Sequence, residues 1–301
     1  MVNIKKTKLF QLLSQSRWNL AFVQDGIEKV ITCESIQFTP VINPYRHQCW
    51  FADPFILDFN DDFIYLLAEE MRYKVPKGRI AKLTIERKKM TIVKVEIVLE
   101  EQWHLSFPNI IRQNGRIFVY PESANSGKLY LYELIDDENG CRLERISTLC
   151  DDVIWDSTIS DLFGDKLMFT SRSNNFHLDI YQWEETDKRF HYSQTLDSTQ
   201  PNMRMAGALF KWGNDVYCPS QISWNRYGEA VEMKKISQTD DGWNLETVRK
   251  LMPPKKMLIN GMHTFNVYKD LIVVDTHQYS HIISKVIGDL ALLKRKIKKR
   301  H

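Results

Sequence analysis

The sequence has no long apolar run and no clustered cysteines. Its five cysteines are widely spaced and form no CxxC pair, which is typical of reduced thiols in a cytosol. No stretch approaches the ~20 apolar residues of a membrane span, and the basic N-terminus lacks an apolar core of signal-peptide length. We therefore expect a cytoplasmic protein.

Several signatures of cofactor and metal chemistry are also absent. The sequence contains no GxGxxG, GxxxxGK[ST], HExxH or GxSxG motif. Its Asp-Asp pairs fall in expected turns, so no DxD-type metal motif stands out. The net charge is only +3 and its excess lies in the C-terminal tail, which leaves no basic face for nucleic acid. These absences predict no cofactor, no metal and no nucleic-acid partner.

A hairpin pattern recurs five times along the chain. Each copy has a short strand, a turn with Gly, Asn or Asp, and a second strand that ends in polar residues. Taking Asp53, Phe107, Asp156, Met205 and His263 as equivalent, the spacings are 54, 49, 49 and 58 residues. Four strands per ~50 residues is one propeller blade. The copies occupy residues 50–70, 104–123, 153–173, 204–221 and 261–278.

The repeat predicts an all-β protein, a five-bladed β-propeller with a short C-terminal helix. The propeller should span residues 18–281 as one domain, after an N-terminal extension over residues 1–17. The fifth blade has too little chain for four strands, so we expect the early strand at 19–25 to complete it. The alternative is a β-sandwich with irregular loops. We expect a monomer.

The same phase of each repeat carries polar side chains. In an antiparallel hairpin the start of the first strand lies beside the end of the second. If each first strand lines the central axis, these side chains meet at one mouth of a funnel, although polar hairpin ends are often simply solvated. The residues concerned are Asp53, Glu69, Glu70, His104, Glu122, Asp156, Arg172, Arg204, Gln221, Tyr227, His263 and His277.

Aromatic residues fall at the same expected rim. Flat aromatic faces stack on the C–H faces of sugar rings, while carboxylates and Arg hold hydroxyls. Packing between blades also uses aromatics, so both interpretations stay open for each ring. The combination of carboxylates and rim aromatics favours a sugar ligand. The aromatics are Trp50, Phe51, Trp103, Trp155, Trp224 and Tyr227.

Several short motifs together resemble one known domain. The motifs are ADPF at 52–55, AEE at 68–70, KGRIA at 77–81, VLEEQWHLSFPNI at 98–110, YPES at 120–123, DSTI at 156–159 and YGEAVEMKKI at 227–236. Through them, the chain from about Trp18 to about Asn266 resembles the N-terminal propeller of the plant glucosamine inositolphosphorylceramide transferases and its stand-alone bacterial relatives. The resemblance implies a five-bladed propeller that works in glycan assembly.

The chain is more distantly similar to the arabinanase, xylosidase and invertase superfamily of five-bladed glycosidases. That resemblance implies that Asp53 is a base or nucleophile and that Asp156 tunes a proton donor. The fourth blade, where arabinanases place the acid Glu, has no carboxylate in phase. Glu122, or Glu69 or Glu70, would have to substitute, which weakens a simple hydrolase assignment.

Three functions remain open at this stage. The favoured one is a glycosyltransferase-type enzyme of cell-surface glycan biosynthesis, with Asp53, Asp156 and Glu122 as catalytic residues. An anionic leaving group would suit Arg172, Arg204 and the histidines. The alternatives are a glycoside hydrolase with an unusual acid and a non-catalytic glycan-binding module. In each case the partner is a sugar or an activated sugar.

The tail at residues 282–301 has the pattern of an amphipathic helix. Apolar residues recur at intervals of three and four, and the end of the tail is strongly basic. We expect the first half of the helix to pack on the propeller and the basic end to meet an anionic membrane surface. A plain solubilising tail is the alternative.

Overall fold

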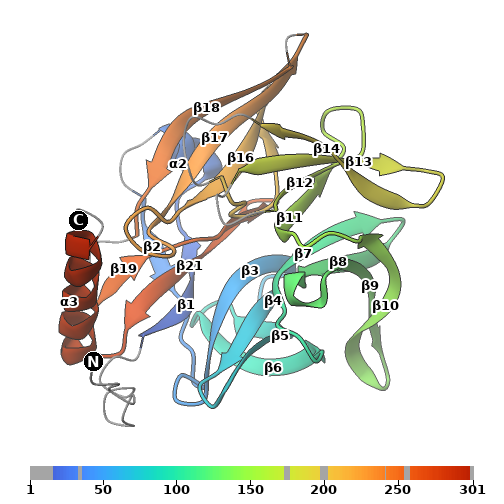
Figure 1. The fold of residues 1–301 in the computed structure, drawn as a ribbon. Helices are drawn as coiled ribbons and strands as arrows, with labels where there is room; N and C mark the ends of the chain where they lie inside the picture. The colour runs from blue at the N-terminus through green and yellow to red at the C-terminus, as the bar shows by residue number, and fades with distance from the viewer. Residues whose placement is uncertain are drawn as a thin grey trace, which may run out of the picture.

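The protein is a five-bladed β-propeller. The computed structural model describes residues 16–32, 36–172, 177–196, 203–240, 242–253 and 258–298. Within them, antiparallel strands form five sheets that follow one another around a central axis (Figure 1). The predicted fold class is confirmed, and the chain passes from one blade to the next in sequence order.

Four blades are consecutive four-stranded meanders. Blade 1 contains β3 (Cys49–Phe59), β4 (Phe63–Arg72), β5 (Val75–Glu86) and β6 (Thr91–Leu99). Blade 2 contains β7 (Ser106–Gln113), β8 (Arg116–Glu122), β9 (Leu129–Asp137) and β10 (Gly140–Cys150). Blade 3 contains β11 (Trp155–Ser160), β12 (Leu167–Ser171), β13 (Leu178–Glu184) and β14 (Arg189–Leu196). Blade 4 contains β15 (Phe210–Trp212), β16 (Asp215–Ile222), β17 (Ala230–Thr239) and β18 (Gly242–Leu251).

The fifth blade joins both ends of the propeller chain. Its strands are β19 (Ile259–Gly261), β20 (Phe265–Tyr268), β21 (Leu271–Tyr279), β1 (Ser16–Val23) and β2 (Phe38–Pro40). Strand β1 pairs with β21 along its whole length, from Ser16 opposite Tyr279 to Val23 opposite Ile272. The expectation that an early strand completes the last blade is therefore confirmed.

The hydrophobic core is divided among the five seams between neighbouring blades. Each of the five clusters of buried apolar residues lies mainly between two adjacent blades, and the cluster between blades 3 and 4 also takes in Phe55 and Phe107 from the innermost strands of blades 1 and 2. At the seam between blades 5 and 1, for example, Leu20 and Phe22 pack with Ile64 and Leu66. Because burial of apolar area is the main favourable term in folding, each blade depends on both neighbours for its stability.

A bulge interrupts the innermost strand at the same point in three blades. The ladder register shifts between Ala52 and Phe55, between Ser106 and Asn109, and between Trp155 and Thr158. The residues inside the bulges, Asp53, Phe107 and Asp156, have φ values of 49°, 46° and 49°. Non-glycine residues adopt this left-handed region at a cost, and such strain gathers at functional sites.

A ring of buried polar contacts links all five blades near the bulges. Each pair of neighbouring blades shares at least one hydrogen bond between their innermost strands or the segments that lead into them. The ring runs through Phe107 N to Asp53 Oδ2 (3.2 Å), Asn109 Nδ2 to Thr158 Oγ1 (3.2 Å), Thr158 Oγ1 to Gly207 O (3.0 Å), Ala208 N to Asn266 Oδ1 (2.9 Å) and Asn266 Nδ2 to Pro54 O (2.9 Å). These bonds hold the inner strands at fixed separations around the axis.

Gly207 is the tightest point of this ring. A Cβ at this position would lie 2.0 Å from Phe265 O, which is backbone and cannot rotate away. We expect Gly207→Ala to lower the free energy of unfolding by about 1–3 kcal/mol, measured by urea denaturation. Gly26→Ala is the matched control, because no atom lies within 4 Å of its added Cβ. Equal stability of the two variants would show that the seam between blades 4 and 5 tolerates expansion.

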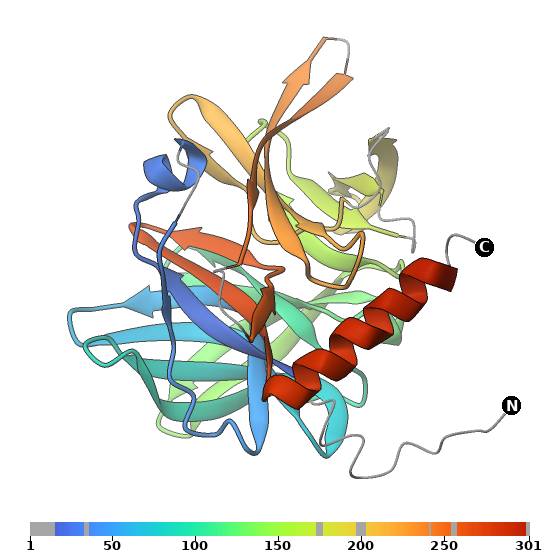
Figure 2. The ribbon, with the colours of Figure 1, turned by 90° about the vertical axis from the view of Figure 1, so that its left-hand side faces the viewer.

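Helices are few among the described residues. A short helix, α2 (Ile27–Thr32), sits between the two N-terminal strands, and a 3₁₀ turn, η1 (Ala124–Ser126), follows β8. Neither was predicted from the sequence. The predicted C-terminal helix is present as α3 (Ile282–Lys298), at the outer side of the fifth blade (Figures 1 and 2). Within the described ranges, no helix has the length and apolarity that crossing a membrane requires.

The four cysteines in the described ranges are buried and form no disulfide. Burial raises the pKa of the Cys49 thiol to about 12 and that of Cys218 to about 11. Protonated, buried thiols are poor nucleophiles and metal ligands, so these residues act as small apolar side chains. Cys33 lies outside the described residues.

Candidate functional site

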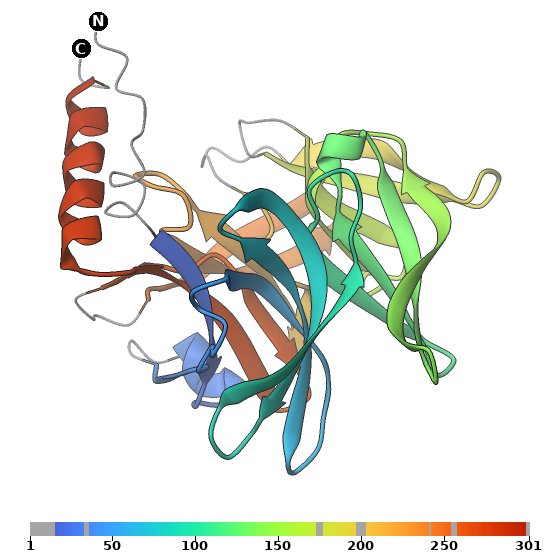
Figure 3. The same ribbon diagram turned by 90° about the horizontal axis from the view of Figure 1, so that it is seen from below.

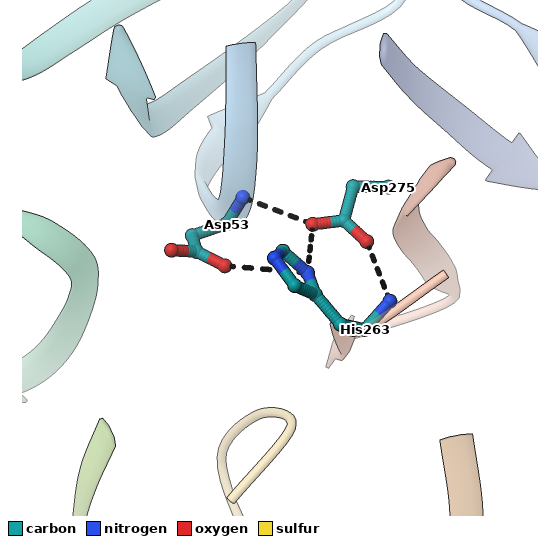
Figure 4. Close-up of side chains that lie close together, drawn as sticks. All are labelled: Asp53, His263 and Asp275. Atoms are coloured by element: carbon teal, nitrogen blue, oxygen red, sulfur yellow. Dashed lines mark hydrogen bonds and ion pairs between the residues drawn. The ribbon is translucent and has the colours of Figure 1, made fainter. Parts of the chain in front are cut away.

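Two aspartates and a histidine meet at the axis where blades 5 and 1 adjoin. Asp53 comes from the bulge of β3, Asp275 from the middle of β21, and His263 from the segment between β19 and β20 (Figure 4). His263 Nδ1 lies 2.6 Å from Asp275 Oδ2 and 3.6 Å from Asp53 Oδ1. All three side chains are buried.

Asp275 anchors this group. Its Oδ1 accepts hydrogen bonds from His263 N (2.9 Å) and Thr264 N (3.0 Å), and its Oδ2 accepts one from Asp53 N (3.2 Å). Although burial alone would raise it, the His263 charge and these donors lower the pKa of Asp275. Asp275 therefore stays ionised and fixes the backbone on both sides of the site.

The three side chains are also close enough to be considered as metal ligands, with candidate ligand atoms within 4.8 Å of one another. The donor set does not suit a cation. Burial opposes protonation of His263, but the charges of Asp275 and Asp53 outweigh it and raise the pKa of the imidazole. A protonated ring offers no lone pair, and both oxygens of Asp275 already have partners. The arrangement is that of a carboxylate–imidazolium pair.

Asp53 lies in an environment that opposes its ionisation. Burial first, and then the negative charges of Glu69, Asp275 and Asp156, raise the pKa of Asp53 well above its usual range, against the lowering effect of His263. A buried carboxyl group with a raised pKa is the form that general acid–base catalysis uses. The bulge and the hydrogen bond from Phe107 N fix the carboxyl group at the axis.

Glu69, on β4 beside Asp53, is the second perturbed carboxyl group. Its Oε1 lies 3.3 Å from His104 Nε2, and His104 Nδ1 accepts a hydrogen bond from Gly78 N at 3.0 Å. Only glycine fits at position 78, since an added Cβ would lie 2.4 Å from Leu105 O and 2.7 Å from Glu69 Oε1. Burial, followed by the charges of Glu122, Asp275 and Asp156, raises the pKa of Glu69 to about 8.

The raised pKa of Glu69 makes stability depend on pH. The folded state binds the proton more tightly than the unfolded chain, whose glutamate has a pKa of 4.5. This contribution to stability is therefore complete below about pH 4.5 and is lost as pH rises through about 8. We expect the thermal midpoint to fall over this range, and to fall less in Glu69→Gln. The exposed Glu144→Gln should behave as wild type, and identical slopes in all three would contradict the assignment.

Asp156 is neutralised by residues that come from blade 4. Arg204 forms a two-point ion pair with it, through Nε to Oδ2 and through Nη2 to Oδ1 at 3.3 Å. Gln221 Nε2 donates to Asp156 Oδ2 at 2.7 Å and to Met205 O at 2.7 Å. Asp156 and Gln221 are buried, and the Arg204 side chain is 17% exposed. Asp156, the bulge residue of blade 3, is thus held to blade 4 by an ion pair and a hydrogen bond.

Glu122 ends β8 and faces the same group of charges. Its Oε2 accepts from Ser106 Oγ and its Oε1 from Ala124 N, both at 2.8 Å. Burial, and then the charge of Asp156, raises the pKa of Glu122, although Arg204 lowers it. The structure therefore brings Glu122 together with Asp53, Glu69 and Asp156 in one electrostatically coupled cluster.

Two predicted members of the site point elsewhere. Glu70 binds Arg79, at 2.7 Å from Oε2 to Nε, and Arg79 also contacts Glu100. Neighbouring residues on a strand face opposite sides, which places Glu69 in the cluster and Glu70 outside it. Arg172 turns toward the outer strands of blade 3, where it pairs with Asp179 at 2.9 Å and stacks on Tyr192. The prediction that these two side chains share the funnel is wrong.

The expected rim of aromatics is only partly present. Phe51 is 1% exposed in the core between blades 5 and 1, and Trp103 stacks on Tyr130 in the seam between blades 1 and 2. Tyr227 and Trp224 are exposed at 54% and 47%. Phe51 and Trp103 are thus packing residues, while the two blade-4 aromatics remain accessible. Trp50 and Trp155 are half-buried at the starts of β3 and β11.

Trp18 is a part of the site that the sequence analysis missed. Its ring stacks on His263 with centroids 3.8 Å apart, and Tyr227 packs edge-on against both rings. His277 lies on its other flank, with ring centroids 5.0 Å apart. Strand β1 carries Trp18 opposite His277 in the ladder. The available signal was a tryptophan at the start of the strand that was expected to complete the fifth blade.

The fold is shared with enzymes of known structure. The chain is similar to an α-L-arabinofuranosidase from Lactobacillus brevis, with a TM-score of 0.55 and 14% identity over 80% of this chain and 87% of that one. It is also similar to Zg3597, a family 117 glycoside hydrolase from Zobellia galactanivorans, with a TM-score of 0.51 and 11% identity over 88% and 90% of the two chains. At these identities the likeness concerns the fold.

The family is shown by sequence. Residues 18–263 match the family described as glucosamine inositolphosphorylceramide transferase 1, N-terminal, and the chain belongs to this family. It is 28% identical over 220 residues to glucosamine inositolphosphorylceramide transferase 1 of Arabidopsis thaliana, and 26% identical over 224 residues to that of Oryza sativa subsp. japonica. The matches cover 69% of this chain and 27% and 28% of those proteins. The chain thus spans about a quarter of its curated relatives.

Proposed function

We propose that this protein transfers a glycosyl group to an acceptor hydroxyl in the propeller funnel, as a step in the assembly of a surface glycan. The observation that carries the proposal is the buried Asp53 carboxyl group, held at the axis by a strained bulge and surrounded by Glu69, Asp156 and the His263 imidazolium. The names of the family and of its curated relatives, which are transferases, support the same class of reaction.

The proposed step uses Asp53 as a general base. The acceptor O–H gives its proton to the Asp53 carboxylate, and the acceptor oxygen forms a bond to the anomeric carbon of the donor. The bond from that carbon to the leaving group breaks, and the leaving group departs with the bonding electrons. A raised pKa makes the ionised Asp53 a stronger base than an ordinary aspartate. His263, 3.6 Å away, holds Asp53 in place and stabilises its ionised form.

An anionic leaving group needs an uncommitted cation. Arg172 and Arg204 are each paired with an aspartate, so they are poorly suited to this role. The Nε atom of Arg226 is buried and has no hydrogen-bond partner among the described residues. The same is true of the Nδ2 atom of Asn260, in the fifth blade. Burial, and then the charges of His263 and Arg226, lower the pKa of His277 to about 4. His277 is therefore neutral near pH 7, which leaves Arg226 as the cation, and we place the leaving group beside Arg226.

Glycoside hydrolysis is the second candidate. It requires a proton donor, and Glu69, whose pKa is raised to about 8, can retain a proton near neutral pH. The pKa of Glu122 is raised in the same direction by burial and by the charge of Asp156. Against it, the blade-4 side chains that contact Asp156 are Arg204 and Gln221, a guanidinium and an amide, and neither can act as a general acid near neutral pH. Transfer therefore agrees better with the arrangement around Asp156.

The test measures binding and product. Purified protein is titrated with a panel of nucleotide-activated sugars by calorimetry, and then incubated with each binder plus simple glycosides as acceptors. Mass spectrometry distinguishes a new glycoside, which the proposal expects, from free reducing sugar. Release of free sugar from aryl-glycosides, lost in Asp53→Asn, would assign hydrolysis instead. If the protein binds a sugar but catalyses neither transfer nor hydrolysis, it is a glycan-binding module and the catalytic proposal is overturned.

A further inference from the structure

Helix α3 presents its apolar side chains to solvent. The helix leaves the fifth blade directly after β21 and stands beside the sheets (Figures 2 and 3). Five large apolar residues on it are more than half exposed, which is unusual for neighbouring residues of one element. They are Ile282 (57%), Ile283 (54%), Val286 (51%), Leu290 (54%) and Leu293 (55%).

The side of the helix that contacts the propeller carries small residues instead. Ser284 is fully buried and lies against His281, and a Cβ on Gly288 would come within 2.4 Å of the Tyr279 hydroxyl. At about 100° per residue, positions 284 and 288 lie on one side of the helix. Positions 283, 286, 290 and 293 lie roughly opposite. The first half of the helix therefore contacts the propeller as expected, but through these small residues, and the apolar stripe points outward.

The end of the same helix is strongly basic. Between positions 294 and 298, the last residues of α3, every residue except Ile297 is Lys or Arg. The single acid of the helix, Asp289, is paired with Lys285 at 2.9 Å. An outward apolar stripe that continues into a dense positive charge is the composition of helices that lie in the interface of an anionic bilayer.

We propose that α3 binds the surface of an anionic membrane, with its outward apolar stripe in the lipid interface and its basic end among the head groups. The helix has 17 residues, so it extends about 25 Å and lies flat along the surface. This surface is distinct from the axial cluster, and the inference does not depend on which reaction occurs there.

The positive charge of α3 favours a lipid surface, rather than a second copy of the chain, as the partner of the apolar stripe. The spacing of the apolar residues also fits a helix pair, but a parallel pair would place two clusters of Lys and Arg side by side. An anionic surface instead attracts every one of these charges, and each basic residue near it increases partitioning by about fivefold. The observed charge is thus complementary to acidic phospholipid.

The test is flotation of the full-length protein with lipid vesicles. We expect recovery with vesicles that mix phosphatidylglycerol and phosphatidylcholine, little recovery with phosphatidylcholine alone, and weaker binding as salt is raised. The double variant Val286→Glu and Leu290→Glu should lower partitioning by about tenfold or more, because it removes apolar area from the stripe. Replacing Lys294, Arg295 and Lys296 by Gln should lower it by about fivefold per residue.

The matched control changes two equally exposed apolar residues on the propeller. Ile146 and Val153 are 49% and 46% exposed, so Ile146→Glu with Val153→Glu should leave flotation unchanged. Failure of the wild-type protein to float with phosphatidylglycerol would overturn the proposal, and so would an equal loss in the control. A dimer in light scattering that becomes monomeric in the α3 double variant, with flotation unaffected, would assign the stripe to a second copy.

Discussion

Asp53→Asn should lower turnover by about 10²–10⁴-fold and leave the thermal midpoint close to that of the wild type. An amide cannot take the proton of an acceptor hydroxyl, which accounts for the loss of activity. Stability is retained because the amide oxygen still accepts the hydrogen bond from Phe107 N, and because Asn tolerates the φ of 49° at this position. The raised pKa also means that the neutral side chain resembles the native protonated form.

Asp58→Asn is the control for this variant, since it makes the same change on the same strand at a side chain that is 62% exposed. It should retain full activity. In the wild type, turnover should fall on the acid side of the pH profile as Asp53 becomes protonated, at a pH well above the usual aspartate pKa of 3.8. Full activity of Asp53→Asn would remove the general-base role. A large fall in its thermal midpoint would show that Asp53 is structural.

Arg204→Met should be among the most destabilising single substitutions in the propeller. It leaves the buried Asp156 carboxylate with Gln221 as its remaining side-chain partner. Breaking a buried ion pair from one side costs about 3–5 kcal/mol, because the charge that remains has lost its partner but not its burial. Chemical denaturation, with the midpoint and slope fitted separately, measures this loss.

Two further variants isolate the cause of that loss. Arg142→Met breaks surface pairs with Asp137 and Glu144, in which every side chain is more than a third exposed, and should leave the free energy of unfolding nearly unchanged. The double variant Asp156→Asn with Arg204→Met removes the orphaned charge and should recover part of the stability. If the double variant is no more stable than Arg204→Met alone, the loss comes from packing of the arginine.

Much of the fold could be predicted because the repeat gives redundant information. Five copies of one hairpin fixed the blade number, and the start of a first strand lies beside the end of the second as expected, for example where Gln221 N donates to Arg204 O. The repeat could not show which side chains of a strand point toward the central axis. Side chains alternate along a strand, and a bulge reverses the alternation. Consequently Glu70 and Phe51 were assigned to the funnel although they face away from it.

The candidate site was predicted less completely than the fold. Asp53, Asp156, Glu122, Arg204 and His263 share the phase of the repeat, and the structure brings them together. Trp18 and Asp275 complete the group. The pairing of β1 with β21 was predicted, but nothing in the repeat indicates that Trp18 stacks on His263. Asp275 lies beside His263 because the ends of a hairpin meet, whereas its role as an acceptor of backbone hydrogen bonds is visible only in the structure.

The closure of the ring by β1 also has a consequence for the order of folding. Strand β1 is synthesised first, but its partner β21 follows only after all the other blades. Pairings between such distant segments form slowly, because a long loop must close, at a cost in chain entropy, before any contact between them can stabilise it. Blades 1 to 4 can assemble on the growing chain, whereas the stack of Trp18 on His263 must form last. A nascent chain therefore completes the axial cluster only at the final step of its folding.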